Sequence, residues 1–140
     1  MIDHQQDNII YIYIMIESII GSGLLLLMFF LAGINKISNF NSTVSGFKSK
    51  FFMKNLPNIF YTLIIVGVII LEIVAPIIIM IDISGYYPLQ ALSFFSTIGL
   101  AIFTILATLM YHPPTVPKEK INFMKNMSIT GGLILLSSFF

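Results

Sequence analysis

Cysteine is absent from the 140 residues, and charged residues make up only 9% of them. Without cysteine the chain by itself cannot carry out thiolate catalysis or hold an iron–sulfur cluster or a cysteine-ligated zinc. Only His4 and His112 could supply imidazole ligands, and His4 lies in a polar N-terminal segment, so a bis-histidine haem site inside a membrane is excluded. We therefore expect no metal site, and any redox chemistry requires a cofactor or a partner.

The scarcity of charge also excludes a water-soluble domain, because soluble domains carry roughly 25% charged residues. Hydrophobic residues make up 57% of the chain, and its mean hydropathy is +0.97. We expect an integral membrane protein with the bilayer as its solvent. No linker-like stretch interrupts residues 1–140, so one compact membrane domain is predicted.

Four apolar runs are long enough to cross the ~30 Å hydrocarbon layer, which takes about 20 helical residues. They cover residues 9–34, 59–81, 89–111 and 123–140. Pro57 precedes the second run and Pro88 the third, as expected at helix starts. The hydrophobicity is continuous rather than alternating, which disfavours β-barrel strands. The predicted fold is all-α, a four-helix transmembrane bundle.

All seven positive residues are lysines, and they fall in two stretches of the chain. The first stretch holds Lys36, Lys48, Lys50 and Lys54, and the second holds Lys118, Lys120 and Lys125. In a four-span chain the connections 35–58 and 112–122 lie on one side of the membrane. The positive-inside rule predicts that this side is the cytosol and that both termini lie on the opposite side.

The first lysine connection interleaves aromatic and cationic residues from Phe47 to Lys54. Such a segment can lie among lipid headgroups, with its lysines toward anionic lipid. A short solvated linker whose lysines only set the topology is the simpler alternative.

Glu72 lies inside the second run, where a carboxylate is costly and normally faces the bundle interior. It could carry protons, bind a ligand or pair with a partner protein's cation. A neutral glutamic acid bonded to a neighbouring helix is an equal alternative. Glu17, in the first run, could lie at the outer interface. If the first two runs are antiparallel neighbours, Glu17 and Glu72 occupy the same outer half, and a shared proton or a cation between them becomes possible.

Polar residues also gather at the inner ends of the runs, where Asn35, Lys36, His112, Lys125 and Asn126 are expected at similar depth. Together they could form a donor-rich pocket for an anionic headgroup, a quinone carbonyl or a small acid. The alternative is that lysines extend toward the interface and asparagines cap helix ends.

The last run contains Gly131 and Gly132, a small-residue pair typical of close helix packing.

The order of these features resembles the DoxX-like superfamily of small four-helix membrane proteins. The resemblance spans nearly the whole chain and rests on Glu72, on the Gly131-Gly132 pair, and on the segments Phe30-Leu31-Ala32-Gly33-Ile34-Asn35-Lys36, Tyr111-His112 and Asn122-Phe123-Met124-Lys125-Asn126. It implies that Gly33, Lys36, Glu72, His112 and Asn126 are the signature positions. Similar proteins include subunits of thiosulfate:quinone oxidoreductase, partners of thiol-oxidant defence enzymes, and chaperones or cargo receptors.

Two functions follow as hypotheses. The first is a non-catalytic membrane subunit or scaffold, which docks a partner protein or further copies of itself and has no activity alone. The second is a quinone- or small-acid-binding component of a membrane oxidoreductase, in which Glu72 handles protons while Lys36, His112 and Asn126 hold the ligand. A transporter ranks last, and nucleic acid is not an expected partner. A cavity that joins Glu72 to the inner residues would favour the second hypothesis.

Overall fold

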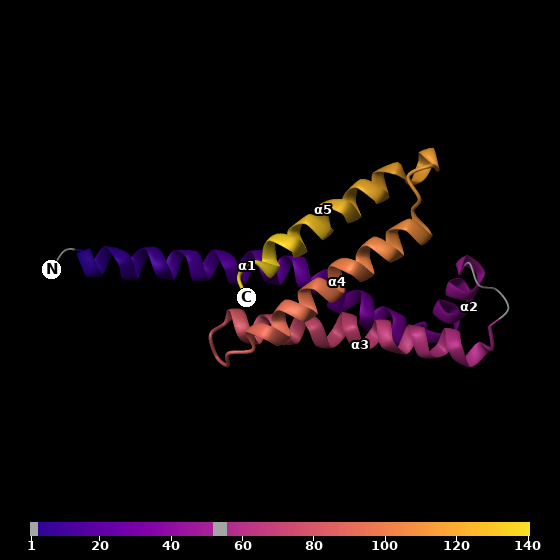
Figure 1. The fold of residues 1–140 in the computed structure, drawn as a ribbon, viewed down its shortest axis with the longest axis horizontal. Coiled ribbons are helices and arrows are strands. Elements are labelled where there is room, and N and C mark those ends of the chain that lie inside the picture. The colour runs from indigo at the N-terminus through magenta and orange to yellow at the C-terminus, as the bar shows by residue number, and fades with distance from the viewer. Residues whose placement is uncertain (1–2, 52–55) are drawn as a thin grey trace.

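A computed structural model describes residues 3–51 and 56–140, with side chains for residues 9, 10, 12–51 and 56–140. Within these ranges the chain forms helices and turns and no strand, which confirms the predicted all-α class. The elements are α1 (Asp3–Ser38), α2 (Phe40–Lys50), α3 (Asn58–Ile83), α4 (Gln90–Tyr111), the short 3₁₀ helix η1 (Pro117–Glu119) and α5 (Lys120–Ser137) (Figure 1).

Three of the described helices are long and apolar enough to cross a membrane. They are Ile12–Ser38 within α1, the whole of α3 and the whole of α4. The length and composition of these helices therefore indicate an integral membrane protein. Helix α5 covers most of the fourth run but is not among the three, since polar residues such as Lys120, Lys125 and Asn126 occupy its first turns.

The helices pack in chain order, with α1 along α3, α3 against α4, and α4 against α5. All four long helices contribute to one core, represented by the almost fully buried Leu26, Ile79, Leu100 and Leu133. The outward faces carry large exposed apolar side chains, for example Leu24 at 70% exposure. A bilayer would cover these faces, whereas water would not.

The predicted connection 35–58 is largely helical, because it contains α2. Phe40, Val44 and Phe47 recur at helical spacing and form an apolar face that packs against Tyr61 of α3. The ring centroids of Phe47 and Tyr61 lie 6.3 Å apart, in an edge-to-face arrangement. The sequence was interpreted as a connecting loop because of its lysines, although the helical spacing of these apolar residues was already visible in it.

A lysine of α2 fastens this short helix to the start of α3. The ammonium of Lys48 donates to Asn58 Oδ1 at 2.7 Å and lies 5.6 Å from the centre of the Tyr61 ring. Figure 1 shows α2 and the connection between α4 and α5 toward the same end of the molecule. Lys54 lies outside the described residues.

Candidate functional site

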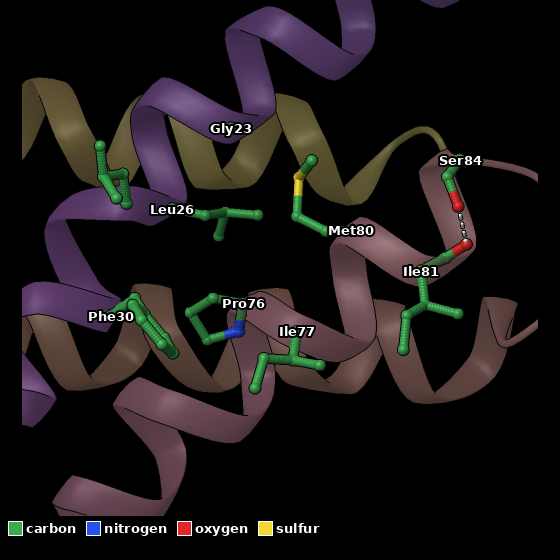
Figure 2. Close-up of a pocket in the computed structure, with 9 residues that line it drawn as sticks. Gly23, Leu26, Phe30, Pro76, Ile77, Met80, Ile81 and Ser84 are labelled. Carbon is green, nitrogen blue, oxygen red and sulfur yellow. Dashed lines mark hydrogen bonds between the residues drawn. The ribbon is translucent and has the colours of Figure 1, made fainter.

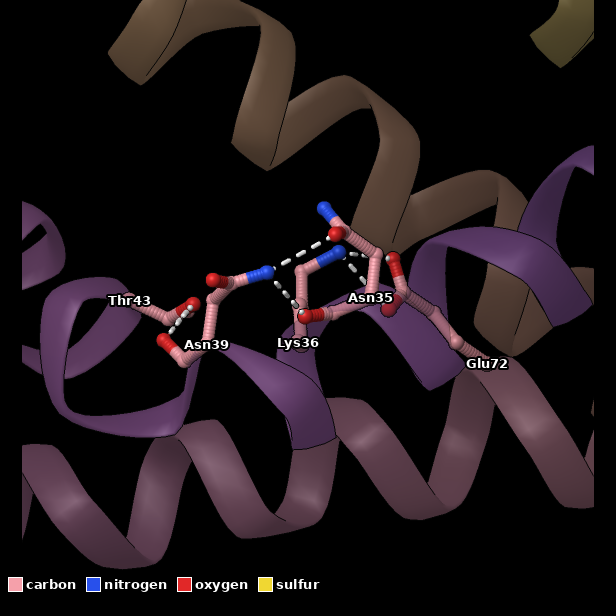
Figure 3. A network of polar contacts seen from close by, with 5 residues as sticks. All are labelled: Asn35, Lys36, Asn39, Thr43 and Glu72. Atoms are coloured by element: carbon pink, nitrogen blue, oxygen red, sulfur yellow. Dashed lines mark hydrogen bonds and ion pairs between the residues drawn. The ribbon is translucent and has the colours of Figure 1, made fainter.

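The central feature is an ion pair between α1 and α3. The Lys36 ammonium donates to both carboxylate oxygens of Glu72, each at 2.8 Å (Figure 3). Glu72 is only 2% exposed, whereas the Lys36 side chain is 24% exposed. Charge-assisted hydrogen bonds to both oxygens offset the cost of burying an ionised carboxylate in apolar surroundings.

Gly33, one turn before Lys36, explains how the two helices come close enough for this pair. A Cβ atom at Gly33 would stand 2.7 Å from Ile73 Cγ1 and 3.2 Å from Glu72 Cβ. The absent side chain therefore permits a close helix approach of the small-residue kind. Residues three apart share a helix face, so Lys36 is directed at the same part of α3.

Hydrogen bonds also join the end of α1 to the start of α2. Asn39 Nδ2 donates to the backbone oxygen of Asn35 at 3.1 Å and to its Oδ1 at 2.9 Å. The Thr43 hydroxyl donates to the Asn39 backbone oxygen at 2.9 Å (Figure 3). Asn35, a candidate for the inner polar cluster, thus supports the helix junction and is exposed rather than part of the ion pair.

Lys36, Glu72, His112 and Asn126 all line one cavity of about 580 Å³. They come from α1, α3, the end of α4 and α5, so only the folded bundle brings them together. This volume lies within the range of small-molecule sites in proteins. The fifth candidate of the inner cluster, Lys125, is exposed and does not line the cavity.

Most of the remaining lining is apolar or aromatic, with Phe29, Phe47 and Phe103 among the contributors. Two threonines of α4 also line it, but their hydroxyl protons are used within the helix. Thr104 donates to the Leu100 backbone oxygen at 2.7 Å and Thr108 to the Thr104 oxygen at 2.6 Å. The cavity therefore combines an apolar body with a small polar region.

His112 is held by a carboxylate that the sequence reasoning did not single out. Its Nδ1 lies 2.6 Å from Glu119 Oε2, and Asn122 Nδ2 donates to the same oxygen at 3.1 Å. These bonds, the one from His112 first, lower the pKa of Glu119. The signal in the sequence was that Glu119 and His112 stand at the two ends of one short, proline-rich connection.

Several polar groups remain available to a ligand. An ammonium has three N–H donors, and Glu72 takes two of those of Lys36. Nδ1 of His112 is directed at Glu119, and Nε2 of the same ring has no hydrogen-bond partner among the residues that the structure describes. Within the described part of the chain the Asn126 side-chain amide has no hydrogen-bond partner. The polar region thus offers donors, and its one buried carboxylate is already compensated.

The expected pairing of Glu17 with Glu72 is wrong. Gly33 lies beside Glu72, and Glu17 stands 16 positions earlier on α1, which is about 24 Å along a helix. Glu17 is exposed and borders a different hollow. The prediction failed because α1 continues far beyond the end of α3, so depth counted from the ends of the apolar runs was misleading.

The two glycines of α5 also behave differently from each other. A Cβ at Gly132 would meet Leu25 Cδ2 of α1 at 3.5 Å, an ordinary packing contact. A Cβ at Gly131 would meet nothing within 4 Å, and this residue is exposed. Gly131 is therefore no packing position in this chain, because consecutive helical residues point about 100° apart and only one of them can face α1.

A second hollow, on the flank between α1 and α3, is almost entirely apolar (Figure 2). Among the described residues that line it, the one polar side chain is Ser84, whose hydroxyl donates to the Ile81 backbone oxygen at 2.7 Å. With no free polar group, this hollow suits a lipid acyl chain and offers little for specific recognition.

No protein-family model matches the chain, and neither a curated protein nor a solved structure matches it significantly. Among the described residues no three histidine or acidic side chains gather as they would around a metal ion.

Proposed function

We propose that the chain is a DoxX-like membrane subunit that binds a small amphipathic ligand through a carbonyl or carboxylate oxygen. The observation that supports this proposal is that Lys36, Glu72, His112 and Asn126 line one largely apolar cavity. A quinone or a small organic acid has the required combination of an apolar body and acceptor oxygens. The chain has no activity alone in this proposal and serves a partner oxidoreductase.

Each polar residue has a distinct role in the proposal. Glu72 fixes the Lys36 ammonium through two bonds, and the third N–H of Lys36 donates to the ligand oxygen. The Asn126 amide provides a second donor. His112 exchanges a proton with the ligand through Nε2, which for a quinone accompanies electrons supplied by the partner oxidoreductase, while Glu119 orients the ring through Nδ1. Both oxygens of Glu72 are occupied by Lys36, so the proton role expected for Glu72 passes to His112.

The proposed topology has four spans, with α5 as the fourth and shortest. Both lysine-bearing connections face the cytosol, and both termini face away from it. The position of α2 and of the connection between α4 and α5 toward the same end of the molecule supports this orientation (Figure 1). The cavity then lies in the cytosolic half of the bundle, where a partner enzyme could reach its ligand.

Ligand-dependent thermal stability of the detergent-purified protein tests the proposal. The probes are a short-chain benzoquinone, a short-chain naphthoquinone and benzoate. A ligand at 100 times its Kd stabilises the folded state by about 2.7 kcal/mol, which a melting experiment detects readily. We expect at least one probe to raise the Tm of the wild type and to lose this effect in His112→Ala and Asn126→Ala.

Two matched variants control for unspecific effects. Asn35→Ala removes an exposed amide outside the cavity, and Glu17→Gln removes an exposed carboxylate outside it. Both should keep the ligand response of the wild type. If no probe shifts the Tm, or if the cavity variants respond like the controls, the ligand-binding proposal fails and a pure scaffold becomes the better explanation.

A further inference from the structure

The ligand cavity proposed above reaches the outer surface of the bundle between α3 and α4. These two helices are in contact at Leu71 and Gly99, where an added Cβ at Gly99 would lie 3.4 Å from Leu71 Cδ1. They diverge toward the end of the molecule that carries α2, as Figure 1 shows. Val68 and Leu106 line the cavity beyond this contact, and the Leu106 side chain is 60% exposed. The cavity therefore opens sideways, between α3 and α4.

This lateral opening lies at the depth of the hydrocarbon layer. Both helices are long and apolar enough to cross a membrane. Leu106 stands five residues before the end of α4 and Val68 ten residues after the start of α3, or about 8 and 15 Å along the helices. Helix α4 is about 33 Å long and α3 about 39 Å, so they exceed the ~30 Å layer by only about 3 and 9 Å. Both positions therefore face acyl chains rather than water.

The wall of the cavity toward α2 is covered by aromatic side chains. Phe47 and Phe51 line it there, with ring centroids 4.9 Å apart, and Phe47 is only 6% exposed. Thr43, one turn before Phe47, completes this wall. A ligand dissolved in the bilayer thus has a direct route between α3 and α4, whereas α2 covers the route from the adjoining end of the bundle.

The chemistry of the lateral opening narrows the ligand class, and this inference rests on the function proposed above. The described side chains that border the opening are apolar: Ile64, Val68, Phe103, Leu106, Ala107 and Met110. A compact soluble acid would leave this space empty, whereas a long apolar chain would fill it and continue into the lipid. We propose that the ligand is a membrane-dissolved molecule with an acceptor-oxygen head, bound by Lys36 and Asn126, and a long apolar chain that leaves the cavity between α3 and α4. Isoprenoid quinones and fatty acids share this chemistry.

Pairs of probes that differ only in the apolar chain test this inference with the full protein in nanodiscs of dioleoyl phosphatidylcholine. One pair is a methyl-substituted benzoquinone and the same quinone with a decyl chain, and the other is butyrate and decanoate. In at least one pair, the long-chain member should reach half of its maximal Tm shift at a concentration lower by about tenfold or more, because each methylene group removed from water favours binding. The pair that responds identifies the head group.

Variants of the lateral opening provide the decisive comparison, because partition into the bilayer concentrates a long-chain probe whatever the variant. Ala107→Leu and Val68→Phe add bulk to the opening from α4 and from α3 and leave the polar residues of the cavity unchanged. In each of them the advantage of the long chain should fall at least about tenfold, since the added side chain occupies the space of several methylene groups. Ala91→Leu, at an exposed alanine of α4 outside the cavity, should keep the advantage.

A measurement without ligand examines the opening by itself. The chain has no tryptophan, so Leu106→Trp introduces a single fluorescent reporter. Phosphatidylcholine brominated in its acyl chains should quench this fluorescence strongly, and aqueous iodide should quench it weakly. Two opening variants from different helices protect the ligand test if one of them folds poorly.

Three results would overturn this inference and leave the ligand site itself in place. They are stronger quenching by iodide than by the brominated lipid, equal Tm shifts by both members of each probe pair, and a long-chain advantage that survives in both opening variants. If no probe of either pair shifts the Tm of the wild type, the proposed function fails and this inference fails with it.

Discussion

Removing one member of the Lys36–Glu72 pair should cost far more stability than removing both. At 2.8 Å, two unit charges attract by about 6 kcal/mol at an effective dielectric constant of ~20. Desolvation of the two ions offsets much of this attraction, so breaking such a pair from one side typically costs about 3–5 kcal/mol. Replacing both partners with apolar residues is typically much less harmful.

The two single variants should differ, because the partners are unequally buried. Lys36→Met leaves a carboxylate that is 2% exposed without its cation, and we expect a loss of about 3–5 kcal/mol. Glu72→Gln leaves an ammonium on a side chain that is 24% exposed and can extend toward the interface, so about 1–3 kcal/mol is expected. The double variant Lys36→Met/Glu72→Leu should be clearly more stable than Lys36→Met, because it leaves no uncompensated charge.

The assay is reversible unfolding in mixed micelles by increasing the fraction of a denaturing detergent, followed by circular dichroism at neutral pH. The exposed charges Lys125 and Glu17 provide matched controls, and Lys125→Met and Glu17→Gln should change stability by less than about 0.5 kcal/mol. If the stability losses of the two single variants sum to that of the double variant within about 0.5 kcal/mol, the two residues have no coupling energy and the reasoning is refuted.

Further predictions concern packing, pH and α2. Gly33→Ala should destabilise by about 1–3 kcal/mol in the same assay, since its Cβ would stand 2.7 Å from Ile73 Cγ1, whereas Gly131→Ala meets open space and should not. The hydrogen bond from His112 lowers the pKa of Glu119 in the folded protein. The ionised Glu119 therefore stabilises the fold at pH values above its pKa in the unfolded chain, and this stabilisation is lost as the pH falls through its pKa in the folded protein. Glu119→Gln should flatten this acid side of the curve of stability against pH. Phe47→Ala should cost about 3–5 kcal/mol, and a loss below 1 kcal/mol would show that α2 is not firmly docked.

The sequence by itself determined the class of the protein and its helices. In lipid the backbone N–H and C=O groups of an apolar run have no water to bind, and a run of about 20 residues meets this requirement as a helix, whose backbone hydrogen bonds are internal. The run 59–81 accordingly lies within α3, and α4 covers the run 89–111 except for Leu89. Composition cannot decide whether a run of about 18 residues with a polar first half spans, so the fourth span stays a prediction.

Only the tertiary structure decided which polar residues meet. Counting positions suggested Glu17 as the neighbour of Glu72, but the pairing depends on the register between α1 and α3. That register is set by side-chain packing at Gly33, a contact between residues 40 positions apart that no local pattern encodes. The same packing brought Lys36 to Glu72, because a helix fixes which face a residue occupies and the bundle decides what lies opposite.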